Sequence, residues 1–285
     1  MTISFIGGDA RAVALARRFE QKGARVRTLA LPAGAPCPCR TLAEAADADA
    51  VILPLPATRD GVYPTTVDGL KAPPLASILS LCEKHTLLLG GRIGDALARA
   101  AAAAGVRLLD YYEDETLLAE NAYATAEVAV GMAMRDLSVT LRGARVGVIG
   151  SGRIARALLS LLMALGARVD VYARNPVSLA SLAARGADPH LFGEGTPLLL
   201  DGGLRAVFST VPVKVLKAEA LSLLRRGTPL YDLGVGGIDS DAAAHLALVT
   251  PDCRALPGRF VPESAASYLF FAIDRILSAE GVYNV

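Results

Sequence analysis

The sequence has no tryptophan, few cysteines and histidines, and no excess of charge of either sign. Its 29 lysines and arginines nearly balance 28 aspartates and glutamates, which gives no electrostatic basis for binding nucleic acid or an anionic membrane. One residue separates Cys37 from Cys39 and no histidine follows at ligand spacing, so the pair does not fit a zinc knuckle. We expect no metal site, and a structural or incidental role for the four thiols (Cys37, Cys39, Cys82 and Cys253).

Long hydrophobic runs are also missing. Glycine, arginine or aspartate interrupts every apolar stretch well before the roughly 20 residues that a membrane span requires. Residues 1–8 read as a strand that enters a turn, without the basic start, apolar run and cleavage site of a signal peptide. We therefore expect a soluble cytoplasmic protein that does not associate with a membrane.

The chain instead shows two series of alternating strand and helix patterns. Strand-like runs in the first series are expected at 3–6, 25–29, 50–55, 86–89 and 106–109, and helices between them at 11–22, 77–84 and 95–104. The second series opens with a strand at 145–149, a helix at 154–165 and a strand at 168–172, with later strands at 206–209, 229–233 and 247–249. Such alternation predicts an α/β fold with two doubly wound parallel-sheet domains, the second a Rossmann domain that binds NAD(P).

Two helical patterns link the series. A long one covers residues 113–141, and the last helix, at 264–279, is positioned to return to the first domain. The predicted domains are therefore 1–120 plus 262–285, a flavodoxin-like substrate or catalytic domain, and 121–261, the Rossmann domain. The two crossings between them could hold a hinge.

A glycine-rich turn between a predicted strand and helix marks the cofactor site. The segment reads Gly150-Ser151-Gly152-Arg153-Ile154-Ala155. Gly150 permits the tight turn, Gly152 lets the backbone approach a pyrophosphate, and Ala155 in the third-glycine place allows close packing of helix on strand. Arg153 either covers the pyrophosphate or is a surface residue of the first helical turn.

The end of the next strand predicts which nucleotide is bound. Sites that prefer NAD place an acid there to hold the ribose hydroxyls, whereas this sequence has Arg174. A guanidinium can pair with a 2′-phosphate, so the cofactor is predicted to be NADP, with Asn175 and Ser178 adding hydrogen bonds. The alternative is that Arg174 is a solvated strand end. Asp170 lies within the strand, too early to serve as the acid.

Later strand ends add cofactor candidates. Thr210, Val211 and Pro212 follow one strand at the place where the nicotinamide ribose lies in such folds, although a plain turn fits as well. Gly234 follows the next strand. A glycine there either lets the backbone come close to a ligand or simply lets the loop turn.

Several motifs together resemble a known family, that of the A-type subunit of dipicolinate synthase. They are Ile6-Gly7-Gly8-Asp9-Ala10-Arg11, Leu53-Pro54-Leu55-Pro56, Gly90-Gly91, Ser209-Thr210-Val211-Pro212, Asp232-Leu233 and Leu256-Pro257-Gly258. The resemblance covers nearly the whole chain in the same order, and it joins the first of these motifs to the downstream glycine turn.

The resemblance implies an NADP-dependent dehydrogenase of sporulating bacteria, located in the cytoplasm of the mother cell. With a flavoprotein-like B-type subunit, such a protein oxidises dihydrodipicolinate, or its hydrated precursor, to dipicolinate. The implied plan is similar to that of the formate/glycerate dehydrogenase group. We also expect a homo-oligomer. The resemblance supplies no catalytic residues.

A dicarboxylate substrate calls for cations in the cleft. Arg11, Arg59, Arg92 and Arg259 lie in predicted loops or helix starts and are candidate substrate ligands, although each also fits a solvated surface position. Proton acceptors could be Glu127, Asp9 or Glu120. Glu127 stands among apolar neighbours, so we expect a partly desolvated carboxylate, unless it faces solvent.

The three histidines (His85, His190 and His245) do not show the Arg/Glu/His arrangement of hydroxyacid dehydrogenases, and we expect them to be noncatalytic. Two alternatives remain open at this point. One is another two-domain NADP-dependent dehydrogenase, of the shikimate or hydroxyacid type. The other is a noncatalytic cofactor-binding subunit.

Overall fold

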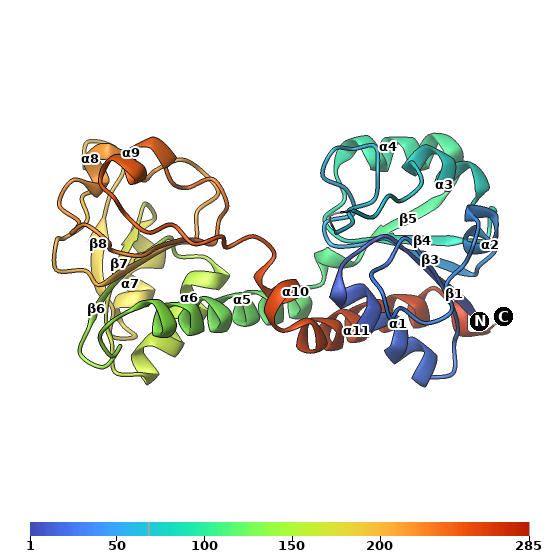
Figure 1. Ribbon diagram of the computed structural model, residues 1–285, viewed down its shortest axis with the longest axis horizontal. Coiled ribbons are helices and arrows are strands. Elements are labelled where there is room, and N and C mark those ends of the chain that lie inside the picture. Colours follow the sequence, from blue (N-terminus) through green and yellow to red (C-terminus); the bar gives the residue numbers. More distant parts are fainter. Residues whose placement is uncertain (68, 285) are drawn as a thin grey trace. The chain divides into compact units, whose positions relative to one another are not determined.

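The computed structural model describes residues 1–67 and 69–284 (Figure 1). The chain divides into two compact units, Met1–Asn121 with Pro257–Val285 (unit 1) and Ala122–Leu256 (unit 2). Each unit contains one five-stranded parallel sheet with helices on both faces. The predicted α/β fold with two doubly wound parallel sheets is therefore confirmed.

The sheet of unit 1 has the strand order β2-β1-β3-β4-β5, which is the flavodoxin-like order. Its strands are β1 (Thr2–Ile6), β2 (Arg25–Leu29), β3 (Ala50–Ile52), β4 (Leu87–Gly90) and β5 (Arg107–Asp110). Every pairing is parallel, and the central strands are almost fully buried, as the continuous apolar run at 50–55 predicts.

Helices cover both faces of this sheet (Figure 1). One face packs against α1 (Ala10–Gln21) and α11 (Pro262–Ala279), in a core that includes Phe5, Phe19 and Ile273. The other face packs against α2 (Leu42–Ala46), α3 (Leu75–Leu81) and α4 (Asp95–Ala104). Because α11 completes a core whose strands all come from the first 110 residues, the end of the chain is an integral part of unit 1.

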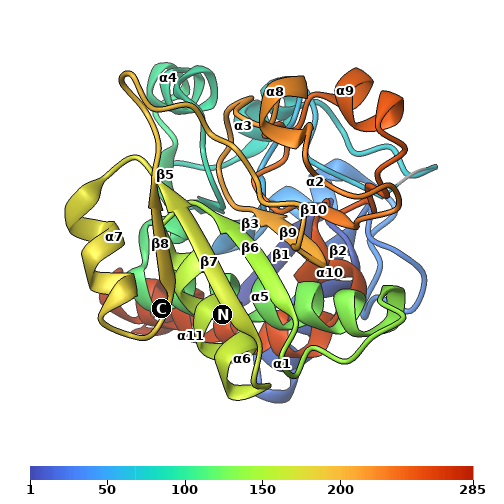
Figure 2. The same cartoon turned by 90° about the vertical axis from the view of Figure 1, so that its left-hand side faces the viewer.

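The sheet of unit 2 has the order β10-β9-β6-β7-β8, and Figure 2 shows these strands side by side. Its strands are β6 (Arg145–Ile149), β7 (Arg168–Ala173), β8 (Asp188–Leu191), β9 (Ala206–Ser209) and β10 (Leu230–Asp232). Numbered within the unit, this is the Rossmann order 3-2-1-4-5. The chain reverses its winding direction at β6, so the loops after β6 and β9 meet at a switch point, where such sheets bind ligands.

The helices of unit 2 also lie on two faces. One face carries α6 (Arg153–Ala164), α7 (Pro176–Ala183) and the part of α5 (Glu115–Asp136) that starts at Ala122. The other carries α8 (Ala218–Leu221), α9 (Ser240–His245) and the segment 198–204. The short helix α10 (Leu256–Phe260) leads from this unit back to α11, and the 3-10 helices are η1 (Tyr111–Glu113) and η2 (Val282–Asn284).

Two predicted elements differ from the structure, and one strand was not predicted. The helix expected at 113–141 is α5 alone, because η1 precedes it and a loop that contains Gly143 follows it. The strand expected at 247–249 is reduced to an isolated bridge between Pro229 and Val249. Strand β8 was not predicted, because three of its four residues are Asp188, Pro189 and His190. None of the described helices is both long and apolar enough to cross a membrane.

Candidate functional site

The glycine turn after β6 opens the site in unit 2. Gly150 has a φ of +111°, which favours glycine, and its N–H donates to the carbonyl of Tyr172 at 2.8 Å. Gly152 is the N-cap of α6, and a Cβ built on it would have no atom within 4 Å. The first N–H groups of α6 therefore start beside open space, as an anion-binding helix N-terminus requires.

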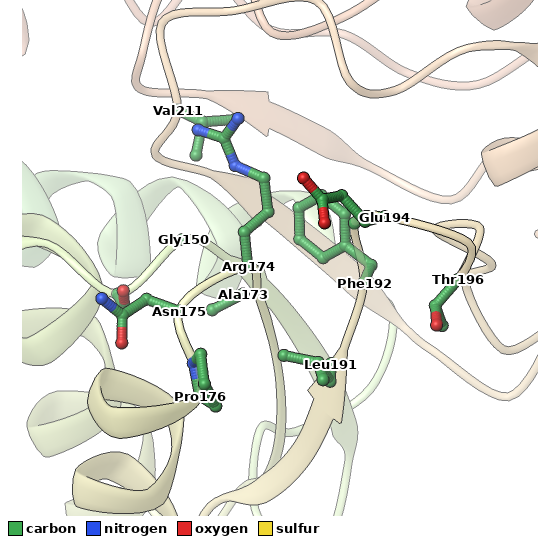
Figure 3. Close-up of a pocket in the computed structure, with 12 residues that line it drawn as sticks. Gly150, Ala173, Arg174, Asn175, Pro176, Leu191, Phe192, Glu194, Thr196 and Val211 are labelled. Carbon is green, nitrogen blue, oxygen red and sulfur yellow. The ribbon is translucent and has the colours of Figure 1, made fainter.

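A cavity of about 870 Å³ lies beside this turn, within the size range of small-molecule sites (Figure 3). Five predicted cofactor residues line it: Gly150, Ser151, Arg174, Asn175 and Val211. Sequence reasoning missed the others, which are Ala173, Pro176, Leu191, Phe192, Gly193, Glu194 and Thr196. Most of the missed residues belong to the end of β8 and the loop after it.

Arg174 is the cation of this cavity. It follows β7 directly, its side chain is exposed, and it forms no ion pair within the described part of the chain. Asp170 is 2% exposed and accepts from Arg145 at 2.7 Å, so it is not an acid at the strand end. Burial raises the pKa of Asp170, and the charge of Arg145 opposes that shift. The charge that β7 contributes to the cavity is therefore positive.

Two of the predicted cofactor residues form a helix cap, and two others lie away from the cavity. Asn175 caps α7: its Oδ1 accepts the backbone N–H of Ser178 at 3.0 Å, and the hydrogen bonds expected from both residues to a cofactor stay a prediction. Arg153 is exposed in the first turn of α6, and Ile154 packs against the core of unit 2. Neither of these last two residues is part of the cavity lining.

The loops after β9 and β10 pack against each other. The Thr210 hydroxyl donates to the Ile149 carbonyl at 2.9 Å, which ties the loop after β9 to the end of β6. A Cβ built on Gly234 would lie 2.2 Å from the carbonyl oxygen of Val211, so this glycine is required for close backbone packing and does not line the cavity. Pro212 is exposed beside them, and only Val211 of this group contributes to the cavity.

In unit 1, Asp9 and Arg11 form a buried ion pair at the end of β1. Arg11 is only 8% exposed, and its Nε and Nη2 donate to the Asp9 carboxylate at 3.0 and 2.8 Å. Nη2 also donates to the Leu55 carbonyl at 2.8 Å. Burial by itself lowers the pKa of Arg11, but the hydrogen bond and charge of Asp9 outweigh it and raise the pKa above its ordinary value. The guanidinium is therefore charged and engaged inside the unit.

This pairing bears on two expectations, Asp9 as a proton acceptor and Arg11 as a substrate ligand. Burial of Arg11 contradicts the alternative that it is an exposed helix-start residue, while the two candidate roles stay predictions. Asp9 also caps α1 by accepting the Arg11 N–H at 3.0 Å. A Cβ built on Gly258 would lie 2.7 Å from both Arg11 Nε and Asp9 Oδ2, so the start of α10 packs directly on the pair.

The other three candidate arginines of unit 1 are exposed. Arg59 and Arg92 follow β3 and β4, which are neighbours in the sheet, so both come to its carboxyl edge. Arg92 has a φ of +56°, and its N–H donates to Asp110 Oδ1 at 2.9 Å. The Arg259 guanidinium lies 5.3 Å from the centre of the Phe260 ring. Among these candidates, Arg59 and Arg92 share one edge of the sheet.

Glu127 lies on the exposed side of α5, so the expected desolvation of its carboxylate is not observed. Glu120 is exposed on the same helix. His85 is exposed beside Glu83, and His190 stacks on Tyr172 with 4.6 Å between the ring centres, outside the cavity lining. The side chain of His245 lies outside the described residues.

The comparisons with known proteins point to one family. Residues 2–112 match the family model described as the N-terminal domain of the A-type subunit of dipicolinate synthase. Over 98% of its length the chain is 25% identical to the A-type subunit of dipicolinate synthase from Bacillus subtilis (strain 168), and the match covers 96% of that protein.

Solved structures show the same fold. The crystal structure of the A-type subunit of dipicolinate synthase from Bacillus halodurans matches with a TM-score of 0.83 and 23% identity, over 97% of each chain. D-lactate dehydrogenase from Escherichia coli matches with a TM-score of 0.65 and 14% identity, over 98% of this chain and 97% of that one. The two-unit plan is thus also that of a dehydrogenase.

Proposed function

We propose that the chain belongs to the family of dipicolinate synthase A-type subunits and is an NADP-dependent dehydrogenase that oxidises dihydrodipicolinate, or its hydrated precursor, to dipicolinate. The observation that carries the cofactor part is Arg174, an exposed guanidinium at the end of β7 in a cavity that begins at the Gly150 turn. The proposed substrate and product are inferred from the similarity to this family.

The residues of unit 2 fit a dinucleotide. The turn from Gly150 to Gly152 and the first N–H groups of α6 would hold the pyrophosphate, because the space beside Gly152 is open. Arg174 would pair with the 2′-phosphate of the adenosine ribose, since a guanidinium offers two parallel N–H donors to a phosphate. The loop that contains Val211 would border the nicotinamide half, by the switch-point rule.

Oxidation of a dihydropyridine dicarboxylate transfers one hydride to the nicotinamide and releases one proton, and the product ring is aromatic. The hydrated precursor also loses one water. The protein's task is then mainly to position the substrate ring and neutralise its two carboxylates. We propose Arg59 and Arg92 for the carboxylates, because both are exposed and follow adjacent strands of unit 1. The Asp9–Arg11 pair ties the end of β1 to the segment after β3, because Arg11 Nη2 donates to the Leu55 carbonyl.

The experiment is an assay of the purified chain with NADP⁺ and the dihydrodipicolinate substrate, with and without the B-type partner. We expect NADPH absorbance to rise together with dipicolinate measured by chromatography. Parallel reactions with shikimate and D-lactate should give no NADPH. Turnover of either of these two compounds in place of the dicarboxylate would overturn the assignment. Turnover that requires the B-type partner would assign only cofactor binding to the isolated protein.

A further inference from the structure

The cavity of unit 2 is lined by a second charged residue, Glu194, which comes from the loop after β8. Strand β8 lies parallel to β7 with Leu191 opposite Ala173, and the Phe192 N–H donates to the Ala173 carbonyl at 3.2 Å. The residues that follow the two strands are therefore neighbours. Arg174 follows β7 and Glu194 follows β8, and both line the same cavity (Figure 3).

A tight turn holds Glu194 in place. Gly193 and Thr196 exchange two backbone hydrogen bonds, of 2.9 and 2.8 Å, with Glu194 and Gly195 at the tip. A Cβ built on Gly193 would lie 3.8 Å from Cγ of Arg174, so the arginine stem runs close to this turn. Glu194 is thus presented beside the arginine by a defined backbone, and not by a long free loop.

The two side chains are the charged members of the cavity lining, and they have opposite signs. Neither forms an ion pair with another residue in the part of the chain that the structure describes. In dinucleotide sites an acid near the adenosine ribose hydrogen-bonds its hydroxyls and repels a 2′-phosphate. Here a cation occupies the usual place of that acid, and an acid enters from the neighbouring strand.

We propose that Glu194 is a specificity-determining residue that hydrogen-bonds the adenosine ribose hydroxyls of NAD(H) and opposes the 2′-phosphate of NADP(H). The inference rests on the proposed function, since it needs a nicotinamide nucleotide in this cavity. Its consequence is that the chain binds both nucleotides, and that its preference for NADPH is smaller than Arg174 alone would give.

The test is a titration of the full chain with NADPH and with NADH, before and after Glu194→Gln. The substitution keeps the shape and removes the charge. We expect NADPH affinity to rise about fivefold, because a repulsion at an exposed site is lost, and NADH affinity to fall by a similar factor, because a charged acceptor is lost. The gain in NADPH affinity should shrink at high salt.

The matched control is Glu219→Gln, an equal change of charge at an exposed position of α8 that is not part of the cavity lining. It should leave both affinities unchanged. A ratio of NADPH to NADH affinity that is the same in Glu194→Gln and in the control would overturn the role of Glu194, while leaving the cofactor assignment intact. A wild-type chain that binds neither nucleotide would overturn the inference and the proposed function together.

Discussion

Replacing Gly150 by alanine is expected to weaken NADPH binding by more than a hundredfold. The added Cβ would lie 2.3 Å from the Thr210 hydroxyl oxygen and 3.2 Å from Cγ1 of Val211, and the backbone φ of +111° is one that alanine rarely adopts. Since Thr210 is hydrogen-bonded to the Ile149 carbonyl, it cannot move without losing that contact. We expect a cost of about 1–3 kcal/mol in stability as well.

Gly152→Ala provides the contrast for this prediction. Gly152 has a φ of −77°, and an added Cβ would meet no protein atom, so the fold should keep its stability. The methyl group would, however, occupy space through which a pyrophosphate approaches the backbone. Thermal melting and nucleotide titration of both variants separate the two effects. Wild-type affinity in either variant would contradict a dinucleotide at this turn.

Removal of the Asp9 carboxylate is expected to destabilise unit 1 by about 3 kcal/mol, because loss of one partner leaves the other charge buried and unpaired. Arg11 is 8% exposed, and Asp9 provides the largest influence that raises its pKa, so the guanidinium would lose its main counter-charge. Asp9→Ala also removes the cap of α1. Hydrogen exchange of the amides in α1 and β1 measures the effect within unit 1 itself.

The double variant Asp9→Ala/Arg11→Met is the control for this prediction. It removes both charges and keeps most of the apolar volume of Arg11, so it should recover part of the lost stability. If the role of Asp9 is structural, the rate of substrate oxidation should recover together with the stability. If stability recovers but the reaction does not, Asp9 or Arg11 takes part in the reaction, and a purely structural role for the pair is wrong.

Local patterns were sufficient to predict the cofactor turn and Arg174. Gly150 and Gly152 stand between a strand and a helix whose apolar spacings are clear, and Arg174 follows the next strand in register. The turn at Gly193 was missed because the β8 sequence Asp188-Pro189-His190-Leu191 has no alternation of apolar and polar residues. That strand is defined by its pairing with β7, which a single-sequence pattern does not reveal.

Burial of charged residues was the other property that the sequence did not reveal. Arg11 stands at a helix start, and it is buried because Leu55 and Gly258, distant in sequence, fold over it. For Glu127 the sequence does contain a sign of exposure, although its immediate neighbours in the chain are apolar. Tyr123, Glu127 and Gly131 recur at a spacing of four residues, and all three are exposed, which is the pattern of the solvent side of a helix.

The measurement that tests the account most directly is the affinity of wild-type chain and of Arg174→Gln for NADPH and NADH, by calorimetry at one ionic strength. The wild-type chain should bind NADPH more tightly than NADH. The variant should lose at least about tenfold in NADPH affinity, since a charge-assisted phosphate contact is removed, and change its NADH affinity less than about twofold. Equal loss for both nucleotides, or no loss for NADPH, would contradict recognition of the 2′-phosphate by Arg174.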